Sequence, residues 1–189
     1  MDNLGCNVDG NSGYQIKIAG FKSSINDYQE IMQKVKEISR KTVKRELSGE
    51  NTDKDCTVQL LNADGIAGSE HIIHATLHAI KAFKRHQNIA QDLGLEICVR
   101  ASAQRQISKA INILGIKNGE INICAVAVGC SNDLMDQMES LLGKRDDDVI
   151  KPDNTVLKSI YGISDLEVNT AGDITRALME RTTLLIVEA

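Results

Sequence analysis

An eight-residue apolar run, Ile121–Val128, limits what this chain can fold into more than any other feature of its sequence. The run contains a single polar residue, Asn122, and is apolar on both faces for most of its length. This pattern is typical of a central strand in a sheet. Alternation of apolar and polar residues predicts three further strands, at Tyr14–Ile18, Cys56–Leu61 and Leu95–Arg100. We therefore expect a sheet of about four strands.

Helical spacing of apolar residues and capping side chains predict about six helices around that sheet. They run from about Ser24 to Leu47, from Ser69 to about Gln91, from Ser102 to Leu114, from Ser131 to about Leu142, from Asp153 to Gly162, and from about Asp173 toward the C-terminus. The predicted fold is α+β, a single domain over 14–189 with a mainly antiparallel sheet. Residues 1–13 are predicted to be a disordered leader, and 48–55 a polar loop.

Composition excludes several classes of function. The chain has 22 basic and 26 acidic residues, a net charge of −4, so it is unlike proteins that coat nucleic acid or anionic membranes. Five aromatic residues and no Trp argue against a platform that stacks several bases. The five cysteines form no CxxC pair, which predicts reduced thiols in a cytoplasmic protein. A small basic surface remains compatible with these numbers.

The second predicted helix carries three of the four histidines on one stripe. His71, His74 and His78 share with Lys81 and Arg85 a face less than about 90° wide. Three histidines could ligate zinc and leave an open position for catalysis, but the order is not HExxH and two cations share the stripe. Alternatively, the stripe is a solvated polar face, or a face that contacts RNA phosphate or a protein.

Two loops have the composition of anion sites. Gly65-Ile-Ala-Gly68 resembles a phosphate-holding loop or a GxxG clamp, but two glycines three apart are also common in tight turns that need positive φ. Arg100 and Arg105 flank the turn from the third predicted strand into the helix capped by Ser102. Backbone N–H groups at a helix start could hold phosphate there, or Ser102 could be an ordinary cap beside surface arginines. No GxSxG or P-loop motif is present.

Two longer runs resemble one known family. Leu61-Asn-Ala-Asp-Gly-Ile-Ala-Gly-Ser-Glu-His-Ile-Ile-His-Ala-Thr-Leu-His-Ala-Ile-Lys-Ala-Phe83 is similar to the kinase-binding accessory subunits of the KEOPS complex, the TPRKB (PRPK-binding) family. Arg100-Ala-Ser-Ala-Gln-Arg-Gln-Ile-Ser-Lys-Ala-Ile-Asn-Ile-Leu-Gly-Ile116 resembles a second signature of that family. The closest similarity extends from about Cys56 to Cys130, and the order of elements fits from about Tyr14 onward.

The resemblance implies a non-catalytic subunit without a cofactor or metal. KEOPS installs threonylcarbamoyl on the tRNA adenosine beside the anticodon. Members of the family bind its kinase-like ATPase subunit, which links them to the catalytic transferase subunit, and archaeal members capture the tRNA 3′ CCA end. The resemblance does not identify individual contact residues, so we predict one set that contacts RNA and one set that contacts a protein partner. The RNA set is Arg100, Arg105, Lys81, Arg85, His74 and His78. The partner set is Leu178, Leu184 and Ile186, with a place in the core as the alternative for this apolar segment.

Two other functions are compatible with the sequence. The first is a scaffold that binds the kinase without contacting RNA. The second is a zinc-dependent hydrolase that uses His71, His74 and His78.

Overall fold

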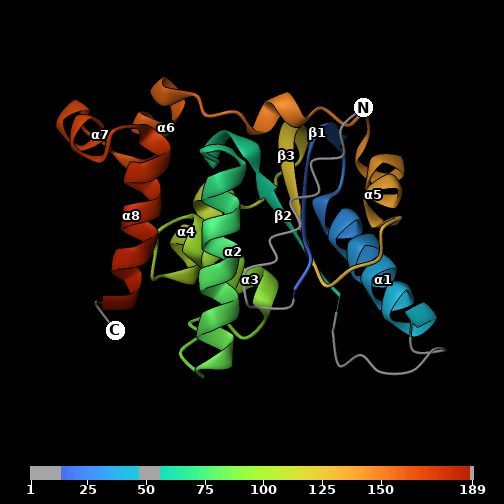
Figure 1. Cartoon of the computed structure of the whole chain (residues 1–189). Helices are drawn as coiled ribbons and strands as arrows, with labels where there is room; N and C mark the ends of the chain where they lie inside the picture. The colour runs from blue at the N-terminus through green and yellow to red at the C-terminus, as the bar shows by residue number, and fades with distance from the viewer. Residues whose placement is uncertain (1–13, 47–55, 188–189) are drawn as a thin grey trace.

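The computed structural model describes residues 14–46 and 56–187. Within these ranges, strands β1 (Ile16–Ile25), β2 (Thr57–Asn62) and β3 (Gly119–Val128) form one antiparallel sheet in the order β1–β3–β2 (Figure 1). Val128 pairs with Ile16 on one side and with Thr57 on the other. The apolar run is therefore the central strand, as its pattern predicts.

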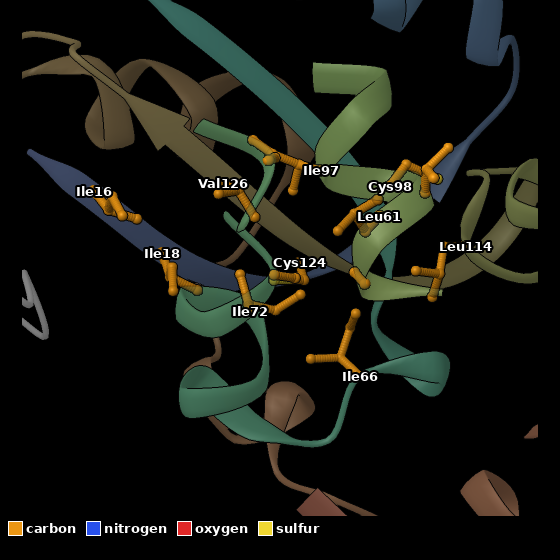
Figure 2. Close-up of a cluster of buried hydrophobic side chains, with 14 of the residues drawn as sticks. Ile16, Ile18, Leu61, Ile66, Ile72, Ile97, Cys98, Leu114, Cys124 and Val126 are labelled. Atoms are coloured by element: carbon orange, nitrogen blue, oxygen red, sulfur yellow. The ribbon is translucent and has the colours of Figure 1, made fainter. Parts of the chain in front are cut away.

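Alternate side chains of β3 enter two separate hydrophobic cores. Cys124 and Val126 point into one core, shown in Figure 2, and Ile123 and Ala125 point into the other. The first core is completed by α2 (Gly68–Lys84), α3 (Leu93–Ala101) and α4 (Ile107–Leu114), and the second by α1 (Tyr28–Glu46) and α5 (Leu134–Leu142). Helices thus cover both faces of the sheet (Figure 1).

The C-terminal third of the chain forms a third, smaller core. It is built around Leu157, Ile163 and Leu178 from α6 (Asn154–Tyr161), the turn after it, and α8 (Ile174–Val187), with α7 (Asp165–Ala171) packed alongside. Helix α8 then returns beside α2 (Figure 1). Thr182 of α8 donates a hydrogen bond to the backbone carbonyl of Arg100 at 2.9 Å. This return brings α2, α3 and α8 together.

The α+β class is confirmed, but the predicted strand Leu95–Arg100 is wrong, because these residues belong to α3. Helix α3 packs against β2, α2, α4 and α8, and every residue from Glu96 to Ala101 is buried. Its apolar pattern therefore reflects burial on all sides and not a half-buried strand. The Asp92 side chain accepts a hydrogen bond from the Leu95 N–H and begins the helix.

Several predicted helix ends also need correction. Ser102 is the C-cap of α3 and does not start a helix; α4 begins after Gln106. Helix α2 ends at Lys84, short of Gln91, and α7 had no predicted counterpart. Asp153 does cap α6, which ends at a left-handed Gly162. The predicted leader 1–13 and the predicted loop 48–55 fall outside the described residues.

The prediction that all cysteines are reduced is wrong for one pair. Cys56 and Cys130 form a disulfide, because the pairing of Thr57 with Val128 brings the residues just beyond these two strand ends together. Cys98 and Cys124 are free thiols, and burial raises the pKa of each to about 12. No described helix has both the length and the apolar character needed to cross a membrane.

Candidate functional site

A pocket of about 270 Å³ lies where α2, α3 and α8 meet. Four cationic side chains line it: Lys81, Arg85, Arg100 and Arg105. The other lining side chains are His78, Ala82, Gln87, Ile89 and Leu185. We call this the basic pocket. It brings together five of the six residues predicted to contact RNA, and it leaves out His74.

The four cations differ in their exposure. Lys81, Arg85 and Arg105 are exposed, whereas Arg100 is only 3% exposed. Arg100 Nε and Nη2 lie 2.8 and 2.7 Å from Oε1 of Glu96, which is itself fully buried. Arg100 thus already has a counter-ion, so the positive charge that the pocket presents to solvent comes from the exposed cations.

Glu96 also shapes the wall of the pocket. Its second oxygen, Oε2, accepts hydrogen bonds from the N–H groups of Ile89 and Ala90, both at 2.8 Å. One buried carboxylate therefore fixes the Arg100 guanidinium and the loop that follows α2. Arg100 itself lies in the last turn of α3, so the expected helix start beside it, with N–H groups available to phosphate, is absent at that position.

The loops on either side of the pocket begin with the same helix-ending motif. After α2, Gln87 N–H bonds to the Ala82 carbonyl and His86 N–H to the Phe83 carbonyl. After α3, Gln104 and Ala103 repeat this pattern with Val99 and Arg100. These are Schellman caps, and their left-handed residues are not glycine: His86 has φ 56° and Ala103 has φ 50°.

The histidine stripe is not a solvated face. His71 is fully buried and its Nδ1 accepts a hydrogen bond from the Ala67 N–H at 3.2 Å. Burial lowers the pKa of His71 to about 4, an effect that the Ala101 backbone partly opposes. The rings of His74 and His78 stack with centroids 4.2 Å apart, and His74 Nε2 lies 3.1 Å from Thr183 Oγ1 of α8. Only the Lys81 end of the stripe is exposed.

This arrangement overturns the zinc alternative. The described residues contain no group of three or more His, Cys, Asp or Glu side chains that could hold a metal ion. His71 lies inside the core with Nδ1 already bonded, away from the stacked pair of His74 and His78. Helical spacing placed the three imidazoles on one stripe, but it could not show which of them the neighbouring helices cover.

The glycine motif before α2 has a structural explanation. Gly68 has φ 90° at the first residue of the helix, and a Cβ on Gly65 would come within 2.5 Å of Leu114 Cδ2. The Ile66 N–H bonds to the Ala63 carbonyl, and the Ala67 N–H bonds to His71. Those two N–H groups are therefore taken up inside the chain, and the phosphate-loop interpretation is not supported.

A second hollow, of about 520 Å³, lies between α2 and the outer side of α8. We call it the α8 groove; it is lined by His74, Arg176, Met179, Glu180, Thr183 and Leu184. Leu184, one of the predicted partner residues, is 54% exposed here. Leu178 is fully buried in the third core and is thus inaccessible to a partner. Ile186 belongs to the last turn of α8, but its side chain lies outside the described residues.

Several pocket residues have no signal in the local sequence. Ile89 and Leu185 are almost a hundred positions apart and meet only because α8 folds back on α2. Glu96 did carry a signal, since Glu and Arg four residues apart form a common ion pair on a helix. Reading this segment as a strand hid that signal.

Comparisons with known proteins identify the family. The family model described as kinase binding protein CGI-121 matches residues 23–185. A regulatory protein Cgi121 from Methanocaldococcus jannaschii is 33% identical over 129 residues, which cover 67% of this chain and 81% of that protein. A KEOPS complex subunit Cgi121 from Pyrococcus abyssi is 36% identical over 78 residues, 41% of this chain and 46% of that protein. The chain therefore belongs to the CGI-121 family of kinase-binding proteins.

Proposed function

We propose that this protein is a cytoplasmic, non-catalytic subunit of a KEOPS complex. In this role it binds the kinase-like ATPase subunit, and through it the catalytic transferase subunit, and captures the 3′ CCA end of tRNA. It thereby supports threonylcarbamoyl modification of the adenosine beside the anticodon. One observation supports RNA binding most strongly. Lys81, Arg85 and Arg105 line one pocket of a chain whose net charge is −4.

The size of the basic pocket favours a single-stranded end over a duplex. A duplex presents phosphates along two strands and is bound by extended positive surfaces. Here the positive side chains surround one hollow of about 270 Å³. An unpaired tail can place its few phosphates at these side chains without the rest of the tRNA contacting the acidic remainder of the surface.

The first experiment is a titration of the full chain with intact tRNA and with tRNA lacking its 3′ CCA, at one salt concentration. We expect the trimmed tRNA to bind at least about ten-fold more weakly. Two charge-reversal variants should weaken the binding of intact tRNA to a similar extent. They are the double variant Lys81→Glu with Arg85→Glu, and the single variant Arg105→Glu. Lys109→Glu makes the same change at an exposed site on α4 outside the pocket and should have no effect.

Arg100 is excluded from these variants on purpose. Reversing its charge would oppose two buried carboxylates at the position of the Glu96 pair and would disturb the fold. Equal binding of both tRNAs, or unchanged binding by the Lys81 and Arg105 variants, would refute RNA capture. The protein would then be better described as a scaffold that binds the kinase alone.

For the kinase contact we propose the α8 groove. A groove beside an exposed leucine suits a protein partner, since buried apolar anchors supply much of the affinity of such interfaces. Leu184→Glu should reduce the affinity for the kinase-like subunit at least about ten-fold, measured with purified proteins. Leu166→Glu on α7 is the matched control, because Leu166 is 76% exposed and does not line the groove. Equal losses in both variants, or in neither, would contradict this location.

A further inference from the structure

Two walls of the basic pocket are joined by one side chain that does not line the pocket. Arg100 on α3 belongs to one wall, and Ile89 in the loop after α2 belongs to the other. Glu96 Oε1 accepts two hydrogen bonds from the Arg100 guanidinium, and Oε2 accepts the N–H groups of Ile89 and Ala90. Glu96 itself is fully buried. Any effect that it has on a ligand must therefore act through these neighbours.

The four hydrogen bonds need an ionised carboxylate. Their donor–acceptor distances lie between 2.7 and 2.8 Å. A carboxylate accepts hydrogen bonds at both oxygens, whereas the amide of Gln has one accepting oxygen and an NH₂ group that only donates. With Gln at position 96, either the Arg100 guanidinium or the two backbone N–H groups would face a second donor. One of the two walls would then lose its hydrogen bonds.

The backbone of each wall has a further anchor of its own. The Arg100 carbonyl accepts a hydrogen bond from Thr182 on α8 at 2.9 Å. The Ala90 carbonyl accepts one from the Asn88 side chain at 2.8 Å. These bonds hold the backbone, and Glu96 sets the guanidinium on one side and the loop N–H groups on the other. Walls that are fixed before binding lose little conformational freedom when a ligand binds, which raises the affinity.

We infer that Glu96 is a positioning residue for RNA capture. It holds the Arg100 guanidinium and the Ile89 wall at the separation that RNA requires, and it does not contact RNA. The inference rests on the proposed function, because it uses the pocket to which RNA capture is assigned. It adds that the affinity for RNA depends on a buried anion, in a pocket whose exposed charged side chains are all positive.

Geometry and charge predict opposite results when Glu96 loses its charge. Glu96→Gln makes the surroundings of the pocket more positive, and charge alone would then strengthen the binding of a polyanion. If Glu96 positions the walls, the same variant binds RNA more weakly. We expect its affinity for intact tRNA to fall at least about five-fold, measured by calorimetric titration at one salt concentration. Tighter or unchanged binding would overturn the inference.

A loss of stability must be kept apart from this effect. Arg100 has no counter-ion in Glu96→Gln, so the melting temperature of the variant should fall. The titrations are therefore made at a temperature at which circular dichroism shows the variant to be fully folded. Glu70→Gln is the matched control, because it makes the same substitution at an exposed site at the start of α2, outside the pocket. It should not weaken tRNA binding.

A second variant keeps the test valid if Glu96→Gln does not fold. Glu96→Leu with Arg100→Met replaces the buried pair by apolar side chains of similar size, a change that is often neutral or stabilising. The net charge stays the same. We expect tRNA to bind at least about five-fold more weakly, with an unchanged slope of log Kobs against log salt concentration. Natural affinity would overturn the inference, and so would a slope shallower by about 0.7, because Arg100 would then act as a phosphate contact.

The outcomes also separate this inference from the proposed function. If Lys81→Gln weakens tRNA binding and Glu96→Gln does not, RNA capture stands and the positioning role is refuted. If the natural chain binds intact tRNA and tRNA lacking its 3′ CCA equally, RNA capture is refuted and the positioning role with it.

Discussion

His71 shows how one buried side chain makes the fold sensitive to pH. Its Nδ1 accepts the Ala67 N–H at the start of α2, so the ring must be deprotonated at that nitrogen. Burial lowers the pKa of His71 from 6.5 to about 4. Between these two values the unfolded chain binds a proton that the folded chain does not, and stability therefore falls as the pH falls.

We predict that the free energy of unfolding drops by up to about 3 kcal/mol between pH 6.5 and pH 4 through His71. Urea unfolding at half-unit pH intervals measures this slope. In His71→Gln the slope should be shallower, because the variant lacks the titrating group. His86→Asn, at an exposed histidine, should keep the slope of the natural chain. Parallel slopes in all three proteins would show that His71 is not responsible.

The two Schellman caps each place a residue other than glycine in a left-handed conformation, which strains the backbone. Ala103 adopts φ 50° after α3, a conformation that costs an L-residue about 1 kcal/mol more than glycine. Ala103→Gly should therefore stabilise the protein by about 1 kcal/mol or slightly less, since glycine also adds entropy to the unfolded chain. Ala101→Gly, two residues earlier inside α3, should destabilise it instead. Chemical denaturation of both variants checks the pair, and a loss of stability in Ala103→Gly would contradict the strain.

The elements that the sequence predicts well are those whose pattern matches their surroundings. Strand β3 is buried on both faces, and its continuous apolar run shows it directly. Helix α6 has both of its signals, Asp153 before it and Gly162 after it. Helix α3 was wrongly predicted as a strand because its residues are buried on all sides, so its sequence lacks the apolar periodicity of a half-buried helix. Nine residues are also too few for a clear helical pattern. The stronger local signals were its Asp92 cap and the four-residue spacing of Glu96 and Arg100.

For the candidate site, the sequence indicated which cations lie together but not their environments. The helical spacing of Lys81 and Arg85 placed them together, whereas the proximity of Arg105 depends on how α3 ends. Nothing in the local sequence indicates that the Glu96–Arg100 pair is buried or that Leu185 lines the basic pocket. Those facts follow from tertiary packing, which brings α8 onto α2 and α3.

At the scale of the whole molecule, the disulfide joins parts of the chain that are far apart in sequence. Cys56 and Cys130 are separated by 74 positions, and a loop of that length gives a chain-entropy contribution of about 4 kcal/mol. We predict that a reducing agent lowers the melting temperature by about 10 °C. Scanning calorimetry with and without reductant measures the shift. The double variant Cys56→Ala with Cys130→Ala should not respond to reductant, and an equal response in both proteins would exclude this bond as the cause.

The distribution of charge over the molecule predicts how tRNA binding should depend on salt. A chain with net charge −4 attracts RNA only where its cations cluster, and the exposed cations of the basic pocket are Lys81, Arg85 and Arg105. Three contacts to a single-stranded tail correspond to a slope of about −2 for log Kobs against log salt concentration. Titrations with intact tRNA between about 50 and 200 mM salt determine this slope.

The neutral variant Lys81→Gln should reduce the magnitude of that slope by about 0.7, the contribution of one phosphate contact to a single strand. Lys109→Gln, outside the pocket, should leave it unchanged. A slope of about −5 or steeper for the natural chain would mean that RNA neutralises far more cations than the pocket contains. Binding would then extend over a broad surface, and the acidic remainder of the molecule would have to be shielded by another subunit. A slope near −2 that falls in Lys81→Gln assigns the electrostatic part of RNA binding to this pocket.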